Sequence, residues 1–319
     1  MMYRNSFNKI RSIEPDIVKY YEININDYEP ITLKAYKIVS DNGKEYFLKE
    51  TKAVALQKYQ YLYNQGVNNV IYPILNRNES FVTRANDSNY YISDYVKQIK
   101  IRNDTRVSNL YNELSILHQQ TQIRKSLDPS KSRGKFDELS SQLDYKFRLL
   151  EQLVRKIEAK NLDTFTLPIL ENYHYILDAK KELVKLQKRL ISSIKAHEGV
   201  NYSFVHNNPD LDHLLNIKGV NYLSSLDNGK IGINSLDMAK FYVMNEQYDI
   251  DFKQLILDKY YDENQLFYYD YFRFLVLVIY IKRMPITIDD YINSNSFFDT
   301  SESIKRYFKN FLDYKEETS

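Results

Sequence analysis

The stretch that decides the fold runs Phe-Val-His-Asn-Asn-Pro-Asp-Leu-Asp-His-Leu-Leu at residues 204 to 215. Apolar residues at both ends enclose a polar middle with two histidines, two asparagines and two aspartates. A helical pattern precedes this stretch, and a strand–turn–strand pattern around Lys218-Gly219 follows it. This frame predicts a polar loop between a helix and a hairpin, where side chains can be presented for chemistry.

Before this loop, residues 1–96 have the periodicity of strands with a single helix. The segments 31–39 and 45–50 flank Ser40-Asp41-Asn42-Gly43-Lys44, a hairpin turn of the Asn-Gly kind. A helix is expected over 51–65, because apolar residues recur at helical spacing and Gly66 follows as a stop. Three further strands are expected at 70–75, 80–83 and 90–95. We therefore predict a small lobe with one five-stranded antiparallel sheet.

Residues 97–319 are mainly helical in pattern. Apolar residues recur every three or four positions, which predicts helices at 107–123, 136–157, 167–194 and from 235 onward. A polar loop is expected at 128–134, and a tight hairpin at 214–217 and 220–224. The order predicts an α+β, two-lobed protein-kinase-like fold, with a small antiparallel-sheet N-lobe and a larger, mainly helical C-lobe.

The composition limits the classes of function. Forty-four basic and 42 acidic residues give a net charge of +2, so we expect neither nucleic acid nor an anionic membrane as a partner. The chain has no cysteine, which excludes disulfides and thiolate chemistry. The most apolar segment, 274–281, is too short to span a bilayer, and the N-terminus has no apolar signal region. We expect a cytoplasmic protein without membrane insertion.

The loop at 204–215 resembles the catalytic loop of the aminoglycoside and choline phosphotransferases, which reads His-Gly-Asp-Leu-His-Pro-Gly-Asn-Ile-Leu. In that family the aspartate contacts the substrate hydroxyl and the asparagine holds magnesium. The corresponding residues here are Asn208 and His213. An amide cannot take up the hydroxyl proton, and a neutral imidazole is a poor ligand for magnesium. Asp210 lies nearby as a candidate substitute.

Tyr46-Phe47-Leu48-Lys49-Glu50 resembles the third strand of the family, which implies that Lys49 is the phosphate-binding lysine. Its usual partner is a glutamate on the next helix, but no acidic residue lies between Glu50 and Glu79. The phosphate-binding hairpin normally contains glycines, yet residues 1–42 contain none. We therefore expect weak nucleotide binding at most.

The metal-binding aspartate of the family corresponds to Ser225 when the chain is aligned on Asp237-Met238-Ala239. A serine hydroxyl cannot replace a carboxylate at a magnesium site. Asp227 could substitute if the loop is shorter, although Asp227-Asn228-Gly229 is also an ordinary turn sequence. Asp237 matches a structural aspartate of the family, and His206 matches its loop histidine, so both are assigned structural roles.

The segment 46–95 contains Tyr59-Gln60-Tyr61-Leu62 and Tyr90-Tyr91-Ile92-Ser93. In this segment and in its layout the chain resembles a branch of this family, the kinase-like spore-coat proteins. This resemblance implies a cytoplasmic protein that is deposited on the spore coat. The loss of several catalytic groups predicts a pseudokinase that acts as a structural or protein-interaction component, with protein partners and no cofactor. The alternative is an active phosphotransferase that uses ATP and magnesium on a small hydroxylated substrate, through Asp210 and Asp227. An unrelated α+β binding protein is a third hypothesis.

Overall fold

The computed structural model describes residues 2–98, 101–159, 166–196, 199–257, 265–288 and 291–312. The chain forms two compact units, each built from two segments. The first contains residues 1–122 and 203–232, and the second contains residues 123–202 and 233–319. The loop at 204–215 therefore belongs to the same unit as the N-terminal sheet.

The first unit is built on a five-stranded sheet in the order β1-β2-β3-β5-β4. All neighbouring strands are antiparallel. The strands are β1 (Ile25–Thr32), β2 (Ala35–Ser40), β3 (Glu45–Thr51), β4 (Thr83–Ala85) and β5 (Ser88–Asp94). The predicted hairpin is confirmed, since Val39 pairs with Glu45 across the turn. Its Gly43 has a φ of 79°, which glycine adopts without strain.

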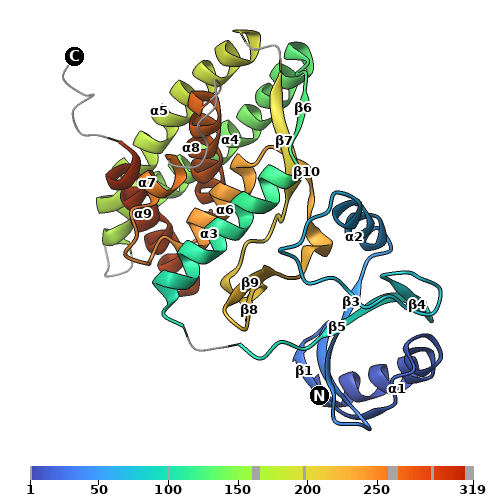
Figure 1. Ribbon diagram of the computed structural model, residues 1–319. Helices are drawn as coiled ribbons and strands as arrows, with labels where there is room; N and C mark the ends of the chain where they lie inside the picture. Colours follow the sequence, from blue (N-terminus) through green and yellow to red (C-terminus); the bar gives the residue numbers. More distant parts are fainter. Residues whose placement is uncertain are drawn as a thin grey trace. The chain divides into compact units, whose positions relative to one another are not determined.

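Two helices of the first unit pack beside this sheet (Figure 1). Helix α2 (Ala55–Asn64) ends before Gly66, as predicted, but begins four residues later than the 51–65 expectation. Helix α1 (Met2–Tyr21) was not predicted, so the expectation of a single helix is wrong. Its Ile13 and Ile17, one turn apart, join the core formed by alternate strand residues such as Ile38 and Leu48.

The predicted strand at 70–75 is also wrong. This segment contributes only an isolated bridge, between Val70 and Leu223, and the fifth strand of the sheet is β1 instead. Pro73 lacks the backbone N–H that a strand ladder needs, which fits an extended connection rather than a strand. The strand expected at 80–83 begins only at Thr83.

The remainder of the first unit is helix α3 (Asn103–Gln120) and the segment that contains the loop. The loop contains η1 (Leu211–His213) and ends in β8 (Leu214–Ile217). After it come β9 (Val220–Leu223), η2 (Leu226–Asn228) and β10 (Lys230–Gly232). Strands β8 and β9 form the predicted hairpin, with Ile217 opposite Val220. Strand β7 (Val200–Val205) leads into the loop, and its end pairs with β10.

The second unit is mainly helical. It contains β6 (Ile123–Lys125), α4 (Pro129–Glu158), α5 (Leu167–Ala196), α6 (Ser235–Asn245), α7 (Phe252–Leu257), α8 (Gln265–Arg283) and α9 (Tyr291–Phe311). The polar loop expected at 128–134 is wrong, because Asp128 caps α4 and Pro129 occupies its first turn. In the part of the chain that the structure describes, no helix is long and apolar enough to cross a membrane.

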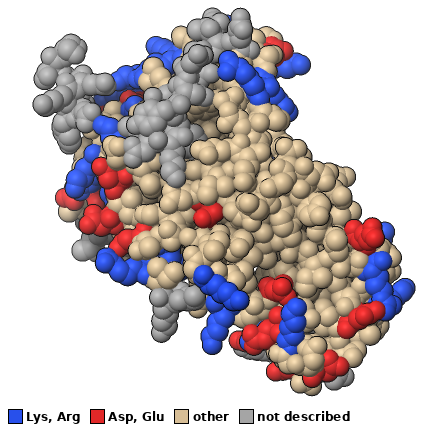
Figure 2. Space-filling view, in the orientation of Figure 1, with Lys and Arg blue, Asp and Glu red and all other residues tan. Residues whose placement is uncertain are grey.

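The architecture confirms the predicted fold class: a small antiparallel sheet in the N-terminal region and a larger helical part toward the C-terminus. Figure 2 shows Lys and Arg side chains beside Asp and Glu side chains at the border of one face, with mostly uncharged residues in its middle. The predicted division at residue 96 and the absence of a nucleic-acid partner stay predictions.

Candidate phosphotransferase-like site

Lys49 lies on a strand of the antiparallel sheet, as predicted; the strand is β3. Side chains alternate along a strand, so Tyr46 and Leu48 face the buried core shared with α1. Lys49 and Thr51 consequently point to the opposite face of the sheet. Lys49 is thus held on a rigid central strand, between β2 and β5, with its ammonium group directed away from the core.

The carboxylate that meets Lys49 comes from the segment that follows the β8–β9 hairpin. Asp227 lies on η2, so residues 226–228 form the turn that the sequence indicated. Lys49 Nζ is 2.7 Å from Asp227 Oδ1, and Thr51 Oγ1 donates to Asp227 Oδ2 at 3.2 Å. The ion pair is largely buried, with side-chain exposures of 17% for Lys49 and 9% for Asp227. Asp227 is therefore both a turn residue and the ionic partner of Lys49.

A second lysine reaches the same turn. Lys58 Nζ on α2 donates to the backbone oxygen of Asp227 at 2.5 Å. Burial lowers the pKa of Lys58, whereas the Asp227 charge opposes that change. The helix that carries a glutamate in the phosphotransferases thus contributes a cation here. Two ammonium groups converge on one acidic residue.

Asn208 and Asp210 are both engaged in the local structure of the loop. The backbone oxygen of Asn208 accepts from the N–H of Asp210 at 2.9 Å and contacts His213 Nδ1 at 2.9 Å. The Asp210 carboxylate accepts from the N–H of Asp212 at 2.8 Å and so caps η1. Asp210, the candidate substitute for the catalytic base, thereby has a structural role as an N-cap.

The two histidines of the loop stack on each other, with ring centroids 5.2 Å apart. His206 is fully buried, and its Nε2 lies 2.9 Å from the backbone oxygen of Ser224. Burial lowers the pKa of His213, and its hydrogen bond to Asn208 opposes this shift. These contacts agree with a structural role for His206, and they direct the Nδ1 atom of His213 toward the loop backbone.

Ser225 has an unusual backbone conformation. It is 9% exposed and adopts left-handed dihedrals, with φ of 60° and ψ of 41°. Left-handed backbone is costly for a residue with a Cβ and is often found at functional sites. Asp237 belongs to the second unit, where it is fully buried in the first turn of α6. The roles assigned to Ser225 and Asp237 stay predictions.

Lys58 and Thr51 are the site residues that the sequence analysis missed. The expected partner of Lys49 on α2 is a carboxylate, which the sequence lacks, so the sequence gives no reason to assign Lys58 to the site. The alternation along β3 could have indicated Thr51, because it lies two residues beyond Lys49 on the same face. The contact of Lys58 could not have been found this way, since its acceptor is a backbone atom.

The residues predicted to meet magnesium–ATP offer few ligands of the kind that magnesium prefers. Magnesium prefers several oxygen ligands, usually including carboxylates. Here the two predicted metal-ligand positions carry a hydroxyl, Ser225, and an imidazole, His213. Among the described residues, no group of three or more His, Asp or Glu side chains is arranged to hold a metal. The turn between β1 and β2, at 32–35, has no glycine with which to approach phosphates.

Comparison with solved structures identifies the fold. An aminoglycoside phosphotransferase from Alicyclobacillus acidocaldarius subsp. acidocaldarius matches with a TM-score of 0.58 and 13% identity, over 93% of each chain. An amicoumacin kinase in complex with AMP-PNP and Ca²⁺ matches with a TM-score of 0.53 and 14% identity, over 94% of this chain and 95% of the kinase. A spectinomycin phosphotransferase matches with a TM-score of 0.51 and 12% identity, over 93% of this chain and 98% of the other.

These likenesses show that the chain has the fold of the kinase-like phosphotransferases. No protein-family model and no curated protein matches the sequence. The hypothesis of an unrelated α+β protein is therefore wrong as regards the fold. At this level of identity the comparisons concern the fold alone, and the chemistry must be inferred from the residues of the site.

Proposed function

We propose that this protein is a pseudokinase: a kinase-like phosphotransferase fold without phosphoryl transfer, which acts as a structural or protein-interaction component. The observation that carries the proposal is that both carboxylates that could have replaced the missing catalytic groups make structural contacts. Asp210 caps η1, and Asp227 is held by Lys49 and Thr51. In this arrangement both carboxylates stabilise the local structure, and neither takes the place of the base or the metal ligands that the sequence lacks.

The expected cost of the lost groups supports this proposal. A positioned general base typically contributes about 10²–10⁴ in rate, and Asn208 cannot act as one. Loss of the metal site would remove the charge stabilisation on which phosphoryl transfer depends almost entirely. With both functions absent, little catalysis would remain.

The resemblance to the kinase-like spore-coat proteins supports a more specific role, as a protein component of the spore coat. Under this proposal the partners are other proteins, and the chain needs neither ATP nor magnesium. Tagged protein should then be found in the coat fraction of spores, if the source organism forms them. Recovery only in the soluble fraction of mature spores would count against this role.

One observation favours the alternative of an active phosphotransferase. Asp227 presents a carboxylate next to Lys49, at 2.7 Å, where nucleotide phosphates would require both a cation and a metal ligand. In that case Asp227 would exchange Lys49 for a metal when nucleotide binds. ATP and magnesium would then be required.

A transfer assay distinguishes the two functions. The protein is incubated with γ-labelled ATP, magnesium and a mixture of hydroxylated acceptors, including aminoglycosides and choline. We expect no labelled product above the level obtained with Asp227→Asn. Transfer by the unaltered protein that disappears in Asp227→Asn, while Asn208→Ala retains it, would establish the active enzyme and overturn the pseudokinase proposal.

A further inference from the structure

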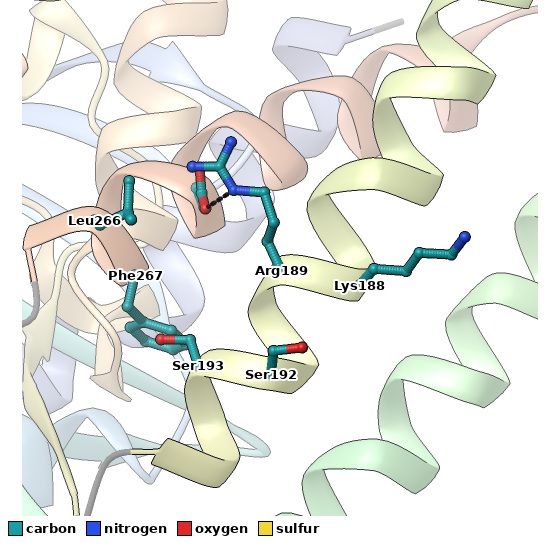
Figure 3. Close-up of a pocket in the computed structure, with 7 residues that line it drawn as sticks. Lys188, Arg189, Ser192, Ser193, Leu266 and Phe267 are labelled. Carbon is teal, nitrogen blue, oxygen red and sulfur yellow. Dashed lines mark ion pairs between the residues drawn. The ribbon is translucent and has the colours of Figure 1, made fainter.

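The charged groups beside the cavity between α5 and α8 hold these two helices together. Arg189 of α5 and Asp270 of α8 form an ion pair, with Nε 2.9 Å from Oδ2 (Figure 3). The Asp270 side chain is only 4% exposed, and the pair fixes the position of the Arg189 guanidinium. These two charges therefore serve helix packing, and a chemically reactive position lies in the first unit instead.

The sequence Asp-Asn-Gly-Lys occurs twice in the chain, at residues 41–44 and 227–230. Asparagine followed by glycine is prone to spontaneous deamidation, because glycine has no side chain to shield its own backbone nitrogen. In this reaction the glycine nitrogen attacks the side-chain carbon Cγ of the asparagine. Since both copies have the same neighbours in sequence, a difference in their reactivity must come from the structure.

Asn42 is held with its side chain against the backbone of the residue that would attack it. Its Oδ1 accepts from the N–H of Lys44, two residues further on, at 3.0 Å. This contact forms an Asx-turn, in which the side chain follows the main chain. The Cγ atom of Asn42 consequently lies beside the nitrogen of Gly43, the residue between them. Such alignment of the reacting atoms lowers the barrier to attack.

Two donors are directed at the oxygen on which negative charge develops during the attack. Besides the N–H of Lys44, the Ser40 hydroxyl lies 2.7 Å from Asn42 Oδ1. This hydroxyl has a second acceptor, the backbone oxygen of Lys44 at 2.9 Å, and can turn fully to Oδ1 as the charge grows. Donors placed at a developing oxyanion stabilise the transition state.

The two copies differ in the space around their glycines. A Cβ at Gly43 would meet no atom within 4 Å, and residues 41–44 are exposed. Gly229 is buried, and a Cβ there would lie 2.3 Å from the ring of Phe204. The cyclic intermediate therefore has room at Gly43 but not at Gly229. Each glycine N–H donates to a backbone oxygen at 2.9 Å, so this bond does not distinguish the copies.

We propose that Asn42 is a site of spontaneous deamidation, whereas the fold protects Asn228. A base from solvent removes the Gly43 N–H proton, the nitrogen forms a bond to Asn42 Cγ, and the side-chain amide takes a proton and leaves as ammonia. Water then opens the resulting succinimide at either carbonyl, which yields aspartate or isoaspartate. The inference is independent of the pseudokinase proposal, because residues 41–44 take no part in the candidate site.

The product alters the turn that sets the register of β2 and β3. Either product places a new carboxylate next to that of Asp41. Isoaspartate also adds a methylene group to the main chain between Ser40 and Lys44, while Val39 pairs with Glu45 across this turn. The reaction thus makes a slow, irreversible change in the sheet of the first unit.

Mass spectrometry of proteolytic peptides from the full-length protein tests the proposal. The folded protein is incubated in mildly alkaline buffer, and the conversion of amide to carboxylate is followed at both asparagines. Asn42 should convert at least about tenfold faster than Asn228, because its reacting atoms are aligned and unhindered. In guanidinium chloride, where both copies are unfolded, the two rates should be similar.

Ser40→Ala removes one of the two donors to Oδ1 and should slow the conversion of Asn42 in the folded protein about threefold to tenfold. Its rate in guanidinium chloride should not change. Ser108→Ala, on α3, is the control and should change neither rate. Equal conversion of the two asparagines in the folded protein would overturn the proposal. So would an Asn42 that stays intact in the folded protein while the unfolded chain converts.

Discussion

Lys49 and Asp227 form an ion pair at 2.7 Å although 178 residues separate them in the chain. The pair joins the central strand of the sheet to the turn that follows the β8–β9 hairpin. Thr51 and Lys58 add two hydrogen bonds to the same turn. Lys49, the predicted phosphate-binding lysine, thus connects two parts of one unit.

This pair should contribute measurably to stability. Asp227→Asn leaves Lys49 largely buried without its counter-charge, so the free energy of unfolding should fall by about 1–3 kcal/mol. Lys49→Met should cost a similar amount, and the double variant should lose less than the sum of the two. Urea unfolding of the four proteins measures the coupling.

An exposed pair provides the control. Arg155 and Glu151 are one turn apart on α4 with side-chain exposures of 73% and 49%, and such pairs contribute about 0.5 kcal/mol at most. A double-mutant cycle with Arg155→Met and Glu151→Gln, measured in the same way, should give a small coupling free energy. If the Lys49–Asp227 coupling is equally small, the pair does not stabilise the unit.

Gly229 is predicted to be required by packing rather than by backbone conformation. A Cβ at this position would lie 2.3 Å from the ring of Phe204, which also stacks on Tyr61. Gly229→Ala should therefore destabilise the protein by about 1–3 kcal/mol. Thermal or urea unfolding of the variant measures the loss.

Gly134 is the matched control, because it lies in α4 and a Cβ there would meet no atom within 4 Å. Gly134→Ala should stabilise the protein by up to about 1 kcal/mol through helix propensity. Phe204→Leu should recover part of the loss in Gly229→Ala by making room. Equal effects of the two glycine substitutions would contradict this account of the contact.

The burial of His213 in the loop predicts that the stability of the protein depends on pH. Burial lowers the pKa of His213 below its ordinary value of 6.5, so the unfolded chain binds more protons than the folded one near that pH. The stabilising contribution is present above pH 6.5 and is lost as the pH falls toward the folded pKa. An NMR titration should show a His213 pKa below 6.5.

His213→Gln removes this proton uptake and should make the free energy of unfolding fall less steeply between about pH 7 and about pH 5. His174→Gln, at an exposed position on α5, is the control for the loss of a histidine. A His213 resonance that titrates above 6.5 would contradict the burial argument.

The sequence predicted the elements whose signals are local. The Asn-Gly turn, the glycine stop after α2 and the helical spacing in α3 and α5 each depend on neighbours in the chain. Helix α1 was missed because Pro15 and many polar residues obscure its one apolar stripe, Ile13 and Ile17. Pro129 stands in a polar segment that indicates a loop, but proline is also favoured in the first turn of a helix, and that is the place it occupies in α4.

The candidate site was only partly predictable, for a different reason. The motif order identified Lys49 and the loop, but the partner of Lys49 is set by how the η2 turn meets the sheet. That relationship depends on tertiary packing, which no spacing in the sequence encodes. For the same reason, the capping role of Asp210 became visible only with the backbone of η1 in place.

Restoring the family residues should not restore phosphoryl transfer. Asn208→Asp, Ser225→Asp and His213→Asn together reinstate the base and the two metal ligands of the phosphotransferases that the sequence resembles. The helix glutamate and the glycine-containing hairpin would still be missing, and Lys49 would remain paired with Asp227. The transfer assay should therefore stay at background, and turnover by this variant would show that the scaffold remains competent.

Binding of magnesium–ATP tests the central claim most directly. A ligand that binds only the folded protein stabilises it by about 2.7 kcal/mol at about 100 times its Kd. Thermal unfolding with and without millimolar ATP and magnesium should show no shift, because Lys49 is engaged by Asp227 and the metal-ligand positions carry Ser225 and His213. A clear magnesium-dependent rise in Tm that Lys49→Ala abolishes would contradict the account.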